Sequence, residues 1–199
     1  PAYGGTMAHL TQPPAGPRTT YYTATSIDGF IADPDNSLDW LLGIEGGDDT
    51  FAPFFKHVGA FAMGSTTYEW VLNHENVGEQ PSKWRKWYGH TPCWVFTHRD
   101  LPGVPGADIT FVHGDVRPVH EAMTRAAGKR NIWLVGGGAL VGAFADEGLL
   151  DEIVLTVAPV TLGAGAPLLP RRLASGVLEL TGVEANGPFV SLSYAVRRS

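Results

Sequence analysis

The chain of 199 residues has the length of a single domain, and its 44% hydrophobic and 17% charged residues can fill an ordinary globular core. A net charge of −6 excludes the broad basic face that nucleic-acid binding requires, although local amides and one arginine can still hold a small anion. The single cysteine, Cys93, excludes an internal disulfide, and no apolar run approaches the ~20 residues that span a bilayer. We therefore expect a cytoplasmic protein with no membrane segment and a buried structural thiol at Cys93.

The first 18 residues hold several prolines and glycines without periodicity, which predicts an irregular arm. Met7 is a candidate native start, in which case residues 1–6 are an added extension. A regular hydrophobic pattern begins at Thr19, so we expect one domain over residues 19–199. The arm is a candidate to pack on a partner subunit, and we expect a homodimer.

Strand and helix patterns alternate after the arm. Strands are predicted over residues 21–26, 60–63, 94–97, 109–112, 132–135 and 153–160, with a further apolar segment at residues 30–32. Helices are predicted over residues 51–57, 68–72, 116–127 and 139–147. The stretch over residues 73–92, which holds Trp84, Trp87 and Tyr88, is interpreted as a loop.

Two more strands, over residues 177–184 and 190–196, close the chain as a hairpin around Asn186-Gly187-Pro188. Alternating elements followed by a hairpin predict an α/β fold of three layers, with helices on both faces of a mostly parallel sheet. The C-terminal strands would form an antiparallel edge.

The strongest local feature is the apolar strand at residues 132–135, which runs into Gly136-Gly137-Gly138 and then into a helix. Glycines there let a ligand approach the backbone, and the free amides of the next helix would face it. A pyrophosphate suits such a place, although a tight turn without a ligand explains the same residues.

A second junction of this kind lies at Gly64-Ser65-Thr66-Thr67, after the strand at residues 60–63. Its hydroxyl residues suit a helix start, so an ordinary capped helix is the alternative interpretation. Thr97-His98-Arg99 follows another strand. His98 and Arg99 are candidates to hold the 2′-phosphate that distinguishes NADPH from NADH, and a solvated turn is the alternative.

The acidic and aromatic candidates are weaker. Asp28 and Asp39 are candidate proton donors, and water is a third candidate. The Asp28-Gly29 pair also suits a turn. Trp40 and the nearby phenylalanines equally suit a core. The seven histidines show no metal-binding spacing, so we expect no metal site.

Four segments, in order along the chain, resemble the dihydrofolate reductase superfamily. They are most similar to the reductase domain of bifunctional riboflavin-biosynthesis deaminase/reductases. The segments are residues 23–32, which contain a DGxIA-like turn, residues 63–69, which are similar to MGRxTxE, residues 135–140, and residues 150–163. The resemblance extends over roughly residues 19–197.

The resemblance implies an NADPH-dependent reductase. Its cofactor residues would be Ala24 and Ile31 at the nicotinamide, Gly64, Ser65, Thr66 and Thr67 at the phosphates, Thr97, His98 and Arg99 at the 2′-phosphate, and Gly136, Gly137, Gly138, Ala139 and Leu140 at the pyrophosphate. Its substrate would lie among Trp40, Phe51, Phe55 and Thr156. In this family the first two glycines of the run often share a cis peptide bond.

Two departures bear on activity. Ser65 stands where dihydrofolate reductases carry an arginine, and the position of their pterin-binding acid falls near Phe51. We therefore expect hydride transfer to a small heterocyclic substrate, such as the riboflavin-type uracil derivative, rather than to dihydrofolate. A nucleotide-binding module without turnover is the main alternative, and a structural homodimer without a ligand is the second.

Overall fold

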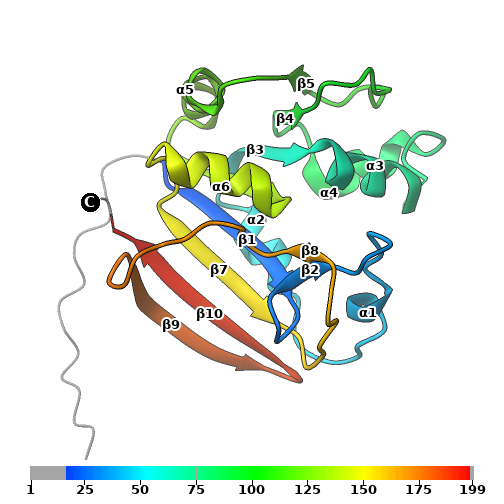
Figure 1. The fold of residues 1–199 in the computed structure, drawn as a ribbon. Helices are drawn as coiled ribbons and strands as arrows, with labels where there is room; N and C mark the ends of the chain where they lie inside the picture. Colours follow the sequence, from blue (N-terminus) through cyan, green and yellow to red (C-terminus); the bar gives the residue numbers. More distant parts are fainter. Residues whose placement is uncertain (1–16, 75, 198–199) are drawn as a thin grey trace, which may run out of the picture.

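An eight-stranded sheet forms the centre of the computed structural model, which describes residues 17–74 and 76–197 (Figure 1). The strands run in the order β5-β4-β3-β6-β1-β7-β10-β9. Their bounds are β1 Thr19–Thr25, β3 Val58–Gly64, β4 Cys93–Phe96, β5 Ile109–Val112, β6 Asn131–Gly136, β7 Glu152–Val157, β9 Leu178–Asn186 and β10 Phe189–Val196. Strands β2 (Phe30–Ala32) and β8 (Ala166–Pro167) pair separately as a small antiparallel sheet.

The six strands from β5 to β7 are parallel, and β10 and β9 continue the sheet as an antiparallel pair. This confirms the predicted α/β class and the predicted C-terminal edge. Because all six parallel strands point the same way, their carboxyl ends lie along a single edge of the sheet. Ligands of open α/β sheets bind at such edges.

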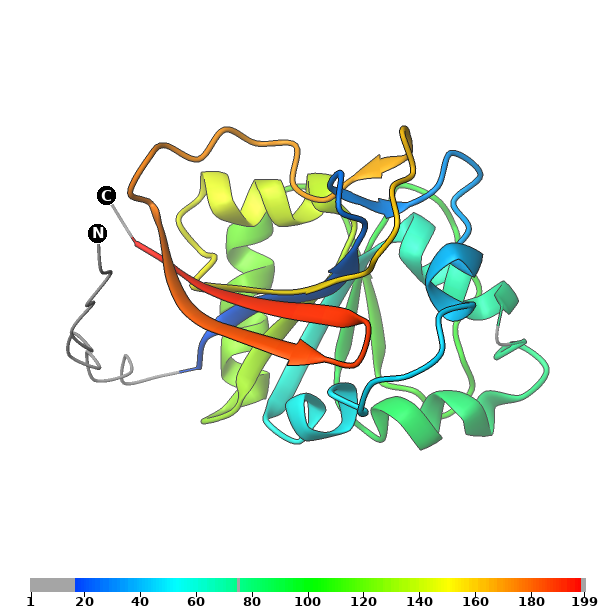
Figure 2. The ribbon, with the colours of Figure 1, turned by 90° about the horizontal axis from the view of Figure 1, so that it is seen from below.

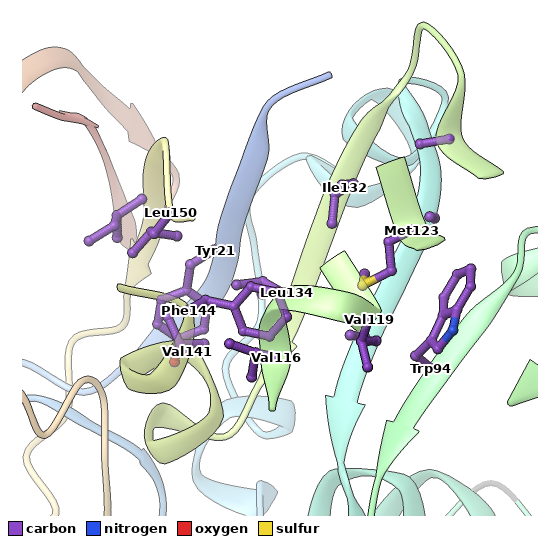
Figure 3. Close-up of a cluster of buried hydrophobic side chains, with 14 residues drawn as sticks. Tyr21, Trp94, Val116, Val119, Met123, Ile132, Leu134, Val141, Phe144 and Leu150 are labelled. Carbon is purple, nitrogen blue, oxygen red and sulfur yellow. The ribbon is translucent and has the colours of Figure 1, made fainter. Parts of the chain in front are cut away.

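Helices cover both faces of the sheet. They are α1 (Asp39–Leu42), α2 (Phe51–Phe55), α3 (Ser65–His74), α4 (Pro81–Tyr88), α5 (Val116–Ala127) and α6 (Gly138–Asp146). Helices α5 and α6 pack on one face, where Tyr21, Met123 and Phe144 belong to one buried cluster (Figure 3). Helices α2, α3 and α4 pack on the other face around a second cluster, which contains Trp84 and Trp133. The three predicted layers are therefore present.

Most predicted elements are confirmed within a few residues, and the strand at residues 109–112 and the helix at residues 116–127 match throughout. The predicted loop at residues 73–92 is wrong, because it contains α4 and the end of α3. Pro81 begins α4, and Trp84 and Tyr88, one helical turn apart, are buried against Phe61. Tertiary packing therefore supports this helix despite its polar sequence.

Three further predictions concern the thiol of Cys93, the N-terminal arm and membrane segments. Cys93 is buried, as predicted, and burial raises the pKa of its thiol well above the usual value. The predicted arm falls mainly on residues 1–16, which lie outside the described residues. Within residues 17–74 and 76–197, no helix has the length and apolar character needed to cross a membrane.

Candidate functional site

The two glycine-marked junctions meet at one place in the fold. Strands β3 and β6 are parallel neighbours, with Met63 paired to Gly136, so the helices that follow them begin side by side. A Cβ atom added to Gly64 would lie 3.7 Å from the backbone nitrogen of Gly137. The starts of α3 and α6 thus form one continuous surface of backbone groups, at which first-turn amides have no partner inside their own helices.

The glycines leave room above this surface. A Cβ atom added to Gly136 would lie 3.8 Å from Oγ1 of Thr67 and 3.9 Å from Cδ1 of Ile31, so this glycine sits between α3 and β2. A Cβ atom at Gly137 would meet nothing within 4 Å, which leaves its backbone open on that side. The Gly136–Gly137 peptide bond is cis, as the family resemblance implied. Such an open cradle at two positive helix ends fits a diphosphate group.

Gly138 lacks a side chain for a different reason. A Cβ atom there would lie 2.6 Å from the carbonyl oxygen of Leu168 and would also clash with the carbonyl of Pro167. Glycine is therefore required for the packing of α6 against this segment, whatever its amide binds. Of the next two predicted cofactor residues, Ala139 is exposed and Leu140 packs partly against the core.

The residues predicted to bind the 2′-phosphate on the adenosine of NADPH lie just after β4. Here the side chain of Thr97 accepts a hydrogen bond from the amide of Arg99 at 2.9 Å, which fixes a tight bend. The bend borders a hollow of about 370 Å³, a size typical of small-molecule sites. The hollow is lined by Thr97, His98, Arg99, Asp100, Phe111, Val112 and His113. Arg99 does not point freely into it, because its guanidinium is paired with Glu69 of α3.

The residues predicted to border the nicotinamide of the cofactor lie on β1 and β2. Ala24 of β1 is half-buried and pairs with Thr156 of β7. Ile31 of β2 approaches Gly136, as described above. The structure therefore brings Ala24, Ile31 and Thr156 to the same end of the sheet as the glycine cradle.

Asp28 stabilises the loop that contains Leu162 and Gly163. Its carboxylate accepts hydrogen bonds from the amides of Gly163, at 2.7 Å, and Leu162, at 3.1 Å, and from Oγ of Ser26 at 2.6 Å. The bond from Ser26 and then the bond from Gly163 lower the pKa of Asp28. A carboxylate held in this way is a better acceptor than a proton donor, so the predicted catalytic role of Asp28 has no support in this geometry and stays a prediction.

Asp39 and Trp40 begin α1, near the carboxyl end of β1 (Figure 1). The side chain of Asp39 is exposed. The indole Nε1–H of Trp40 is buried and has no hydrogen-bond acceptor among the described residues. An unpaired buried donor is costly, so this group is available to an acceptor on a bound ligand.

Phe51 and Phe55 were predicted to border the substrate. Both belong to an aromatic cluster around Trp133, at ring-centroid distances of 5.4 Å and 5.9 Å. Phe54, on the same helix, instead stacks on Tyr22 at 4.2 Å between ring centroids. The phenylalanines therefore pack beneath the predicted substrate site, and we call the surface that they support the floor of this site.

The sequence interpretation missed a group of hydroxyls at this floor. The hydroxyl of Tyr22 lies 2.7 Å from Oγ1 of Thr50. Burial raises the pKa of Tyr22, while hydrogen bonding with Thr50 and Thr156 opposes that rise. The alternation of side chains along a strand could have revealed the position of Tyr22. Because Tyr21 is fully buried on one face of β1, Tyr22 and Ala24 occupy the other face.

The described residues contain no group of three histidine, cysteine, aspartate or glutamate side chains that could hold a metal ion. The candidate site is therefore a strip of backbone amides, hydroxyls and one arginine–glutamate pair along the carboxyl edge of β4, β3, β6, β1 and β7.

Comparison with known proteins identifies the family and the fold of the chain. The model of the RibD C-terminal domain matches residues 17–192. An uncharacterized protein of Bacillus subtilis (strain 168), YwjB, is 35% identical over 182 residues, which cover 89% of this chain and 97% of that protein.

Solved structures show the same fold. A putative riboflavin biosynthesis protein from Shewanella sp. PV-4 has a TM-score of 0.72 at 25% identity, covering 91% of this chain and 99% of that one. A dihydrofolate reductase from Enterococcus faecalis, complexed with NADP(H), has a TM-score of 0.53 at 13% identity, covering 91% and 97%. The second likeness shows a dihydrofolate reductase-like fold and no more.

Proposed function

The chain belongs to the RibD C-terminal domain family, and from this premise we propose that it is an NADPH-dependent reductase of a small heterocyclic substrate. The observation that carries the proposal is the pairing of two glycine-opened helix starts, after β3 and β6, at adjacent positions of one sheet edge. One such start is common in proteins without ligands, but two side by side supply convergent donors for a diphosphate.

The strand order supports one orientation of the cofactor. From β4 to β1 the edge crosses β3 and β6, a span of three strand spacings of ~4.8 Å each. The adenosine would lie in the hollow beside Arg99, the diphosphate over Gly64 and Gly137, and the nicotinamide beside Ala24 and Ile31. This direction would bring the reactive end next to Thr156 and Tyr22.

When bound, NADPH would supply the hydride, and the protein would contribute position and electrostatics. The amides at the starts of α3 and α6 would neutralise the diphosphate. The hydroxyls of Tyr22, Thr50 and Thr156 would orient the substrate through neutral hydrogen bonds, and the Nε1–H of Trp40 would donate another. We propose water as the proton source, with Asp39 as the alternative, because the hydrogen bonds to Asp28 favour its ionised form.

The substrate would be a polar heterocycle of the kind reduced by 5-amino-6-(5-phosphoribosylamino)uracil reductase. The charge of Asp49 acts on the Tyr22 hydroxyl, but this carboxylate already accepts hydrogen bonds from the amides of Phe51 and Ala52 at the start of α2. Neutral hydroxyls at this floor favour an uncharged ring. We propose that the enzyme acts in the cytoplasm.

The main alternative is a module that binds the nucleotide without turnover, and titration separates the two. NADPH is titrated while tryptophan fluorescence is followed, and then NADPH oxidation is followed at 340 nm with candidate heterocycles. Binding followed by oxidation supports the reductase. Binding without oxidation of any candidate favours the module, and absence of binding overturns both.

A matched pair of variants at Gly137 tests the position of the diphosphate. Gly137→Asp and Gly137→Asn have the same shape, so they share any steric or backbone effect. The aspartate adds a negative charge beside the proposed diphosphate and is expected to weaken NADPH binding by a further ~10-fold or more. Equal affinities for the two variants would place the diphosphate elsewhere.

A further inference from the structure

The loop that joins α1 to α2 has little regular structure of its own. It runs from residue 43 to residue 50, forms neither a helix nor a strand, and contains three glycines. Gly46 and Gly47 have positive φ angles of 100° and 88°, a backbone conformation that glycine adopts at little cost. Because such a segment has many conformations open to it, contacts from outside must hold it in one of them.

The last three residues of this loop are each anchored. Oγ1 of Thr50 lies 2.7 Å from the hydroxyl of Tyr22, at the floor of the predicted substrate site. The carboxylate of Asp49 accepts two amides at the start of α2 and so fixes the end of the loop to that helix. Asp48 is held by a distant part of the chain, the turn between β9 and β10.

The anchor of Asp48 is the side chain of Asn186. The amide of Asp48 donates to Oδ1 of Asn186 at 2.6 Å, and Nδ2 of Asn186 donates to the carbonyl oxygen of Asp48 at 2.9 Å. One carboxamide thus supplies a donor and an acceptor to the main chain of one residue, as a neighbouring β-strand would. Both bonds fix the backbone of Asp48, and neither involves its carboxylate.

The loop and the turn also fit closely against each other. A Cβ atom added to Gly187 would lie 2.6 Å from the backbone nitrogen of Gly47, and one added to Gly47 would lie 3.0 Å from the carbonyl oxygen of Asn186. Both glycines have positive φ angles. Glycine is therefore required on each side of a contact that joins segments 138 residues apart.

The pairing of the strands explains why this turn reaches the substrate site. Strand β10 is antiparallel to β7, and Val190 near its start pairs with Val157 at the carboxyl end of β7. The turn at residues 187–188 therefore lies at the same edge of the sheet as the glycine cradle. Figures 1 and 2 both show the loop between α1 and α2 passing beside this turn.

We propose that Asn186 is a positioning residue of the substrate site, an inference that rests on the proposed function. By fixing the backbone of Asp48, Asn186 sets the place of Thr50 two residues further on. The hydrogen bond between Thr50 and Tyr22 then fixes the direction in which the Tyr22 hydroxyl meets a substrate. The C-terminal hairpin thus takes part in substrate recognition, while NADPH binding depends on the starts of α3 and α6.

Hydrogen exchange tests the anchor without any substrate. In Asn186→Ala the amide of Asp48 loses its acceptor and should exchange ~10-fold faster or more, while the amide of Phe51 stays protected by Asp49. Asn186→Asp keeps an acceptor for that amide but loses the donor to the carbonyl of Asp48, so an intermediate rate is expected. Glu184→Ala changes an exposed residue of the same strand and should leave the exchange as in the wild type.

Kinetics with a substrate found by the oxidation screen test the role of the anchor. Asn186→Ala should raise KM by ~10-fold and change the NADPH affinity by less than about 2-fold. Loss of folded protein alone would lower kcat and leave KM as it was. Thr50→Val tests the route, because a residue that acts through Thr50 has little left to lose in its absence. The double variant should therefore be little worse than Thr50→Val alone.

Gly47→Ala breaks the same contact from the side of the loop and leaves the hairpin sequence intact. It should reproduce the KM of Asn186→Ala, so the proposal stays testable even if Asn186→Ala fails to fold. Unchanged exchange at Asp48, an unchanged KM, or additive losses in the double variant would overturn the positioning role alone. A wild-type chain that oxidises NADPH with no candidate heterocycle gives a different result, which overturns the proposed function and this role with it.

Discussion

The guanidinium of Arg99 and the carboxylate of Glu69 face each other through two parallel hydrogen bonds, with Nη1···Oε1 at 2.9 Å and Nη2···Oε2 at 2.6 Å. Both groups remain partly exposed to solvent, so the pair adds little to stability. Its consequence is positional, since it ties the segment after β4 to α3 across 30 residues of sequence. It holds a fixed positive group at the rim of the hollow proposed for adenosine.

This pair predicts how the protein discriminates between nucleotides. Arg99→Ala should weaken NADPH binding by ~10-fold, or about 1.4 kcal/mol, and NADH binding far less, because only NADPH carries the 2′-phosphate. Glu69→Gln removes a negative charge next to that phosphate and should strengthen NADPH binding a few-fold. Fluorescence titrations with both nucleotides check this. Equal losses for NADPH and NADH in Arg99→Ala would remove Arg99 from the site.

Ser65 predicts a gain of affinity. It is the first residue of α3, at the edge of the cradle, where dihydrofolate reductases carry an arginine. Ser65→Arg should strengthen NADPH binding by several-fold and make the affinity more sensitive to salt, since a new charge contact is screened by ions. Ser65→Gln has a long side chain without the charge and serves as the control. If glutamine strengthens binding as much as arginine, charge is not the cause.

The two tyrosines of β1 provide a matched pair for the substrate floor. Tyr22→Phe removes the hydroxyl next to Thr50 but keeps the ring that stacks on Phe54. With a substrate found by the oxidation screen, kcat/KM should fall by about 10-fold while NADPH affinity is unchanged. Tyr21→Phe removes a hydroxyl that donates to the carbonyl of Leu168 on the opposite face. It should lower stability by ~1 kcal/mol and leave kcat/KM unaltered.

Alkaline pH should destabilise the fold through Tyr68. Its hydroxyl donates to the carbonyl of Pro102 at 2.7 Å, and burial raises its pKa to about 12 from the usual value of 10.0. The folded state holds this proton more tightly than the unfolded state, so stability is complete below pH 10 and falls as pH rises towards 12. The slope contributed by this one group is at most ~1.4 kcal/mol per pH unit.

Chemical denaturation of the wild-type chain and Tyr68→Phe between pH 8 and 11 measures this effect. The variant should lose ~1 kcal/mol at pH 8 with the hydrogen bond to Pro102, and its stability should then decline less steeply with pH. Parallel declines in the two proteins would assign the alkaline transition to other groups, of which buried Tyr21 is one because burial raises its pKa too.

Local patterns were enough to predict most of the elements and the class of the fold. The helix at residues 116–127 has an aspartate cap, an apolar stripe and a terminal glycine, which are short-range signals that need no knowledge of the rest of the chain. The same holds for the strand-glycine-helix junctions at Gly64 and Gly136. Helix α4 was missed because its stability comes from Trp84 and Tyr88 packing on Phe61, a distant strand residue.

The site itself needed tertiary information. No local pattern reveals that β6 is inserted between β3 and β1, yet this strand order alone brings the starts of α3 and α6 together. The same order decides that Tyr22 meets Thr50 and that Arg99 meets Glu69. Sequence patterns report which side chains share a face of one element, because backbone geometry repeats over a few residues. Which faces then meet depends on burial and pairing over the whole chain.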